Sequence, residues 1–164
     1  MKTKTEFSAP SATDIQFVRR FAADRSRLWA LWTQAEHLRN WWGPKGFTTP
    51  VCEVDFKPGG VWFYCMQDAA GQHYCGKMTY DEIDPPHRFS ATDVFTDEAG
   101  NLNPDLPAAH TEIAFAEVNG ETVVTGFSRY RSQSERDQII EMEVEAGLSQ
   151  TLDRLDEYLQ SLME

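Results

Sequence analysis

Residues 143–162, EVEAGLSQTLDRLDEYLQSL, decide the fold of this chain because they predict one long amphipathic helix. At the helical repeat of about 100° per residue, one broad stripe is apolar or small and the opposite side is polar. The stripe consists of Val144, Gly147, Leu148, Thr151, Leu152, Leu155, Tyr158, Leu159 and Leu162. A helix of about twenty residues is roughly 30 Å long, which is the width of a small domain. We therefore expect the rest of the chain to form the surface that covers this stripe.

Two small residues, Gly147 and Thr151, are neighbours on the apolar side of the predicted helix. A glycine inside a helix costs about 1 kcal/mol relative to alanine, so its presence needs a reason. One interpretation is that the helix and the sheet approach each other closely at this point. The other is that the small side chains leave room for a ligand. The sequence leaves both interpretations open.

Length and charge restrict the class of protein. The 164 residues predict one globular domain in residues 13–164, after a flexible arm in residues 1–12. The net charge of −11 argues against nucleic acid or an anionic membrane as a partner, because both attract positive charge. No run is long enough to span a membrane, and the first residues lack the apolar core of a signal peptide. We therefore expect a cytoplasmic protein, either a monomer or a homodimer.

The cysteines and histidines form no recognisable chemical motif. Cys52, Cys65 and Cys75 are odd in number and lack CxxC spacing, so we expect free thiols and no structural zinc site. The four histidines have neither HxxxH nor HExxH spacing. There is also no GxSxG, GxxxxGK or GxGxxG motif. The sequence therefore predicts no catalytic motif of these kinds, no metal and no cofactor.

The first part of the chain predicts one strand and two short helices. Residues 14–21 alternate in the manner of a strand. Asp24 can cap the first helix, and residues 33–36 have the pattern of a capping box that begins the second. Gly43-Pro44 ends the second helix.

A hairpin signal sets the register of the next strands. Residues 69–71 form a three-residue loop with Gly71 in the left-handed position, which makes Asp68 and Gln72 neighbours. The resulting pairs are Met66 with Tyr74, Tyr64 with Gly76, Trp62 with Met78 and, on the opposite face, Cys65 with Cys75. Whether the two thiols ever join stays open.

Residues 87–96 predict a further strand in which Phe89, Asp93 and Phe95 share one face. Asp93 then lies either inside the fold, where it needs a partner or a raised pKa, or at a solvated strand end. Residues 97–109 predict a long mobile loop.

The last hairpin has the strongest local signal. Asn119-Gly120 is a two-residue turn between alternating runs. It pairs Phe115 with Val124 and Ile113 with Gly126 on an apolar face. Residues 132–135 are a capping box that begins a helix, and this helix is out of phase with the later stripe. We therefore expect a break near Met142.

The order of the elements indicates an α+β fold. One strand, two short helices and about six further strands precede the long helix. A curved antiparallel sheet of six to seven strands curls under its own twist, and the long helix can lie across its concave face.

Several motifs, in their order and spacing, resemble a known family. They are Phe21 through Trp32, Trp41-Trp42-Gly43-Pro44, Pro58-Gly59-Gly60-Val61-Trp62, Gly76 with Glu82-Ile83-Asp84-Pro85-Pro86, Thr122 to Gly126, and Gly147, Leu152, Arg154-Leu155 and Leu159. They resemble the stand-alone bacterial proteins related to the C-terminal domain of the activator of Hsp90 ATPase (the AHSA1 domain). These proteins have the helix-grip fold of the START and Bet v 1-like (SRPBCC) superfamily. The resemblance covers about residues 14–162.

The resemblance implies an internal cavity between the sheet and the long helix, but it does not imply one activity. The inward-facing aromatic and sulfur-containing residues are either core or the wall of this cavity. The candidate cavity residues are Trp41, Trp62, Tyr64, Met66, Tyr74, Met78, Phe89, Asp93, Phe115, Gly147 and Thr151. Trp41 and Trp42, at the end of the second short helix, and the loop 97–109 are the candidates for the mouth of the cavity.

Three functions follow from this reading. The first is binding of a small hydrophobic molecule, lipid-like or aromatic. The second is a cyclase or aromatase-like enzyme in which Tyr and Asp side chains act as acid and base on a polyketide-like substrate. The third is an interaction with an Hsp90-like chaperone. For the third we expect weak stimulation of the Hsp90 ATPase or none. The resemblance covers only the C-terminal domain of the two-domain co-chaperone and leaves no room for the N-terminal domain that is associated with ATPase stimulation.

Overall fold

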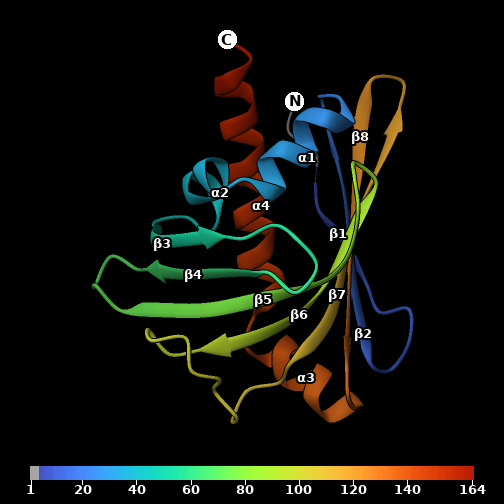
Figure 1. Ribbon diagram of the computed structural model, residues 1–164. Coiled ribbons are helices and arrows are strands. Elements are labelled where there is room, and N and C mark those ends of the chain that lie inside the picture. Colours follow the sequence, from blue (N-terminus) through green and yellow to red (C-terminus); the bar gives the residue numbers. More distant parts are fainter. Residues whose placement is uncertain (1–3) are drawn as a thin grey trace.

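The computed structural model of this protein describes residues 4–164. It has a single antiparallel sheet of eight strands in the order β1-β2-β8-β7-β6-β5-β4-β3. The elements are β1 (Glu6–Ser8), β2 (Asp14–Phe21), α1 (Arg25–Thr33), α2 (Ala35–Trp41), β3 (Thr48–Val54), β4 (Val61–Gln67), β5 (His73–Asp84), β6 (Arg88–Thr96), β7 (Ala109–Val118), β8 (Glu121–Tyr130), α3 (Gln133–Glu141) and α4 (Val144–Leu162). The sheet curves around α4, which crosses its concave side, while α1 and α2 lie toward one end and α3 at the other (Figure 1). The predicted helix-grip fold is confirmed.

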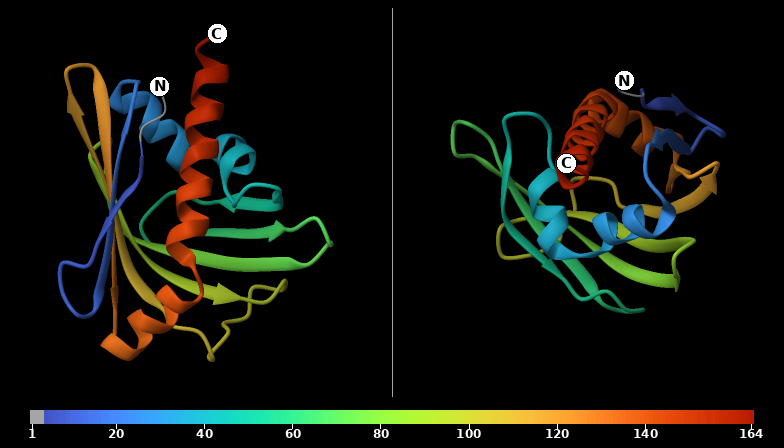
Figure 2. Two further views of the ribbon diagram at one scale, coloured as in Figure 1. Left: turned by 180° about the vertical axis from the view of Figure 1, so that it is seen from behind. Right: turned by 90° about the horizontal axis from the view of Figure 1, so that it is seen from above.

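The view along the long helix shows how the sheet holds it. Figure 2 shows α4 nearly end-on, with the strands curving around it. The buried side of its later turns consists of Leu152, Leu155 and Leu159, each at most 1% exposed. These are stripe residues, as the helical period predicts. Among residues 4–164, no helix is long and apolar enough to cross a membrane.

The hairpin predictions are confirmed in register. Met66 pairs with Tyr74, and Cys65 with Cys75. In the last hairpin Phe115 pairs with Val124, and Asn119 has the positive φ of 54° that its turn requires. The break near Met142 is also confirmed, because α3 ends at Glu141 and α4 begins at Val144.

The N-terminal arm and one capping box differ from the prediction. Residues 1–3 of the expected loose arm lie outside the described residues, whereas Glu6–Ser8 form β1 against β2. The predicted box at residues 33–36 does not cap α2, which begins after Gln34 without a side-chain cap. Thr33 is instead the last residue of α1, and its hydroxyl donates to the carbonyl oxygen of Trp29 at 2.7 Å. A threonine that can reach the preceding turn of its own helix need not act as a cap.

The expectation of three free thiols is wrong in this structure. Cys65 and Cys75 form a disulfide, and Cys52 is the free cysteine within residues 4–164. The reason is the register, since directly opposed residues of antiparallel strands bring their Cβ atoms to about 4.5–5.5 Å.

The predicted mobile loop, residues 97–109, has hydrogen bonds within itself. Asp97 accepts from the backbone N–H of Ala99 and Asn101, each at 2.9 Å.

Buried and partly buried arginines fix α4 to the rest of the molecule. Arg19 of β2 is 1% exposed and donates to Asp153 at 2.7 Å, with Asp156 3.6 Å away. The helical pattern had placed both aspartates on the solvated side. Arg154 donates to the carbonyl oxygens of Gly43 at 2.8 Å and Pro44 at 3.3 Å. These contacts join the long helix to β2 on one side and to the segment after α2 on the other.

Candidate functional site

A cavity lies between the concave face of the sheet and the first turns of α4. Its volume is about 370 Å³, which lies within the range of pockets that hold small organic ligands. The sheet contributes side chains from β2 and from β4 to β8, and α4 contributes Val144, Gly147, Leu148 and Thr151. The hollow therefore lies beside the segment in which the sequence placed two small residues.

The surroundings of Gly147 favour one of the two interpretations of its presence. A Cβ added to Gly147 would meet only Pro44, with its Cγ at 3.7 Å, which is an ordinary contact. Close approach of the helix to the sheet therefore does not require this glycine. Thr151, one turn later, is 4% exposed and donates its hydroxyl to the Gly147 carbonyl oxygen at 2.9 Å. Its hydroxyl is thus satisfied within the helix, and its methyl group adds to the apolar wall.

The hairpin of β4 and β5 supplies one wall through Tyr64, Met66, Tyr74 and Met78. A Cβ on Gly76, opposite Tyr64, would lie 2.6 Å from the Tyr64 hydroxyl, so the glycine makes room for this ring. Tyr74 is 41% exposed and lies at the rim, where its hydroxyl donates to Asp68 at 3.1 Å. With Gly147, Thr151 and Asp93, seven of the eleven candidate residues line the cavity. That a ligand contacts them stays a prediction.

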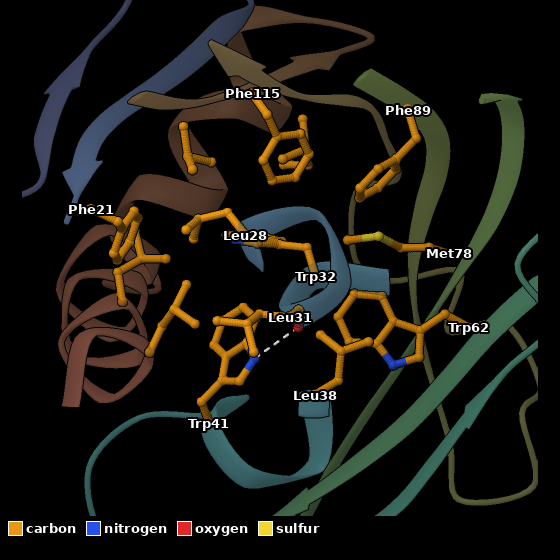
Figure 3. Packing of buried hydrophobic residues seen from close by; sticks show 14 of the residues in the cluster. Phe21, Leu28, Leu31, Trp32, Leu38, Trp41, Trp62, Met78, Phe89 and Phe115 are labelled. Carbon is orange, nitrogen blue, oxygen red and sulfur yellow. Dashed lines mark hydrogen bonds between the residues drawn. The ribbon is translucent and has the colours of Figure 1, made fainter. Parts of the chain in front are cut away.

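The other four candidates, Trp41, Trp62, Phe89 and Phe115, are not on the cavity wall but in the packed core. Figure 3 shows them around Leu31 and Trp32, with the bond from the Trp41 indole N–H to the Leu31 carbonyl oxygen, 3.0 Å long. Their positions are corrections to the predicted site. Of the two tryptophans predicted at the mouth, Trp42 lines the cavity and Trp41 does not, because consecutive residues at a helix end point in different directions.

Asp93 of β6 lies on the cavity wall, so its inward orientation is the one the structure adopts. It is partly buried, and within residues 4–164 no donor is within hydrogen-bond distance of its carboxyl group. Burial raises its pKa from 3.8 to about 7. Burial also raises the pKa of Tyr64 and Tyr130, and the charge of Asp93 adds to both shifts.

The polar part of the cavity continues across three strands. Asp93 pairs with Ala109, which pairs with Tyr130, so β6, β7 and β8 carry this row side by side. In the next row the hydroxyl groups of Thr111 and Ser128 are 3.2 Å apart. A few polar groups on a largely apolar wall are typical of sites that orient a small molecule.

Several cavity residues were not among the candidates. The most prominent are Phe17, Trp32, Thr111, Ser128 and Tyr130. The register of the last hairpin could have found Ser128 and Thr111, since both follow the face of Gly126 and Ile113 at a spacing of two. No local signal identifies Trp32, whose orientation depends on how α1 packs against the sheet.

The cavity has no arrangement typical of a metal centre. Within the described part of the chain, no three His, Cys, Asp or Glu side chains converge in a way that could hold a metal ion. His73 forms an ion pair with Glu98 at 2.7 Å on the rim of the β4–β5 hairpin, and Cys75 is in the disulfide. Cys75 is therefore not available as a thiol nucleophile beside His73.

Comparisons with known proteins agree with the fold and the order of motifs. The family model described as "Activator of Hsp90 ATPase homolog 1-like protein" matches residues 22–160. The crystal structure of protein Ms6760 from Mycobacterium smegmatis is 31% identical over 95% of this chain and 96% of that chain, with a TM-score of 0.87. A solution structure from Arthrobacter aurescens is 26% identical over 95% and 91% of the two chains, with a TM-score of 0.86. No curated protein matches the sequence.

Proposed function

This chain belongs to the family of activator of Hsp90 ATPase homologue 1-like proteins, and from that premise we propose that it binds a small hydrophobic molecule in its internal cavity. The fold family commonly binds hydrophobic ligands. The observation that supports the proposal most directly is the hollow of about 370 Å³ beside Gly147, where a filled core would be expected. Most of its wall is aromatic or aliphatic, so an apolar molecule gains by leaving water.

The size of the hollow suits one ring system or a short chain. A cavity of this volume costs stability unless something fills it, because its lining loses dispersion contacts. A ligand that binds the folded state alone adds about 2.7 kcal/mol of stability at one hundred times its dissociation constant. Ligand binding would therefore show as a rise in the Tm of unfolding.

The test uses 2-naphthylmethanol as a neutral apolar probe with the wild type, Gly147→Leu and Ala146→Leu. The leucine at 147 extends from the helix into the cavity, whereas Ala146 is exposed on the other side of the same turn. We expect the probe to raise the Tm of the wild type and of Ala146→Leu, and to have at least tenfold lower affinity for Gly147→Leu. Equal affinity for all three proteins would show that the probe binds elsewhere and would contradict the proposal.

A second candidate function, a cyclase or aromatase-like enzyme, has one observation in its favour. Asp93 faces the cavity with a pKa of about 7, which suits a general base near neutral pH. On a polyketone chain, its carboxylate could take a proton from a carbon between two carbonyl groups. The enolate carbon would then attack another carbonyl carbon of the chain to close a ring, and the alkoxide formed as that C=O π bond opens would take the proton back from Asp93. Ring formation that proceeds equally fast with Asp93→Asn would refute this role.

The third candidate, an interaction with an Hsp90-like chaperone, rests on the name of the family alone. We expect little or no change in Hsp90 ATPase turnover when the protein is added. A clear increase would favour this function over ligand carriage.

A further inference from the structure

The charges around the cavity have one sign. Asp93 and Glu143 are the charged residues on the wall, and within residues 4–164 no Lys, Arg or His side chain lines it. The nearby cation Arg154 is bonded to backbone carbonyl oxygens of the segment after α2. The interior field therefore opposes an anion and favours a cation.

Asp93 also differs from two buried carboxylates elsewhere in the fold in having no cation beside it. Asp14 receives two bonds from Arg129, at 2.9 and 3.2 Å, and Asp156 lies 3.6 Å from Arg19. A buried carboxylate normally has such a partner, because the desolvation of an unpaired charge is costly. The cation that would pair with Asp93 can therefore come from a molecule in the cavity.

We propose that the cavity selects an apolar molecule with one basic nitrogen, which forms an ion pair with Asp93, and that it rejects apolar carboxylates such as fatty acids. This inference rests on the proposed binding function and names the class of its ligand. The protonated nitrogen has several N–H donors. One of them bonds to the carboxylate, and the hydroxyl groups of Tyr130, Thr111 and Ser128 on the adjacent strands can accept others. The apolar remainder lies against the wall of Tyr64 and Met78.

The experiment compares three probes that share a naphthalene ring and differ only in the head group. They are 2-naphthylmethylamine, 2-naphthylmethanol and 2-naphthoate, titrated by calorimetry at pH 8. At this pH Asp93 is mostly ionised and the amine mostly protonated. We expect the amine to bind at least tenfold more tightly than the alcohol, and the carboxylate to bind more weakly than either.

Two variants test whether Asp93 causes the preference. Asp93→Asn should bring the affinities for amine and alcohol to within about threefold of each other. Asp105→Asn is the control, because it removes the same charge from an exposed position that does not line the cavity. It should keep the tenfold preference.

A pH series on the wild type gives an independent reading if Asp93→Asn does not fold. Between pH 8 and pH 6 Asp93 becomes protonated while the amine stays charged, so the preference should fall several-fold. The other titratable groups on the cavity wall are Glu143, Tyr64, Tyr74 and Tyr130. The tyrosines, whose pKa values are raised, do not change charge in this interval.

The failures of the two proposals are distinguishable. If the alcohol binds and the amine binds no better, or if the preference survives in Asp93→Asn, the inference about the nitrogen is refuted and hydrophobic binding stands. If none of the three probes binds, both proposals are contradicted.

Discussion

The first and the later turns of α4 are parts of one continuous helix in opposite surroundings. Residues 152–159 place Leu152, Leu155 and Leu159 in the core at no more than 1% exposure. Residues 144–151 place Val144 and Leu148, both partly exposed, beside the cavity. The apolar stripe runs through both halves without a change in its period. Helical periodicity therefore identifies the face that turns inward, but it does not tell a packed face from one that borders a hollow.

The largest expected difference between the halves is in stability. Leu155→Ala leaves a new void in a filled core and should cost about 3–5 kcal/mol of unfolding free energy. Leu148→Ala enlarges a hollow that already exists and should cost about 1 kcal/mol. Urea unfolding with both variants measures the contrast. Equal losses would mean that the first turns are as tightly packed as the later ones.

The next effect in size is the pH dependence of the cavity half. Asp93 has a pKa of about 7 in the folded protein, against about 3.9 in an unfolded chain. The folded state therefore binds more protons between these values, and stability falls as the pH rises from about 4 to 7. From pH 5 to pH 8 the wild type should lose about 2–3 kcal/mol relative to Asp93→Asn. Unfolding curves for both proteins at the two pH values test this. If the two proteins differ in unfolding free energy by the same amount at both pH values, Asp93 is solvated.

The smallest effect concerns the glycine itself. Gly147→Ala should stabilise the protein by about 0.5–1 kcal/mol, because alanine favours the helix and its methyl group meets only Pro44 at an ordinary distance. Gly126→Ala is the matched contrast, since a Cβ there would overlap the ring of Phe17. It should destabilise the protein. A loss of stability with Gly147→Ala would show that the hollow beside the helix is narrower than described.

Where turn chemistry acts locally, the fold could be predicted from the sequence. Asn119-Gly120 restricts its hairpin to one register, and the capping box at Ser132 begins α3, with the Ser132 hydroxyl accepting from the Glu135 N–H at 3.1 Å. Contacts between distant segments were not predictable in this way. Nothing in the helical pattern indicates that Asp153 and Asp156 meet Arg19, because the partner lies on β2, more than 130 positions earlier in the chain.

The same contrast between local signals and distant contacts separates the cavity residues that were predicted correctly from those that were not. Tyr64, Met66, Tyr74 and Met78 follow from the register of one hairpin, and each lines the cavity. Trp41 and Trp42 were both placed at the mouth on sequence position alone, and of the two Trp42 lies on the wall. Which of these two neighbouring residues faces the cavity depends on the packing of α1 and α2, and local patterns do not specify that packing.

The bonds of Arg154 have a consequence for how fast the proposed ligand would enter and leave the cavity. Its guanidinium, on the packed half of α4, bonds to the carbonyl oxygens of Gly43 and Pro44, and Pro44 borders the hollow. Bonds to a charged donor contribute about 1.5–3 kcal/mol. The rim segment is thereby clamped to the helix rather than to the strands. If the proposed ligand leaves past Pro44, its dissociation rate will depend on these bonds, whereas its affinity will depend on the side chains of the cavity wall.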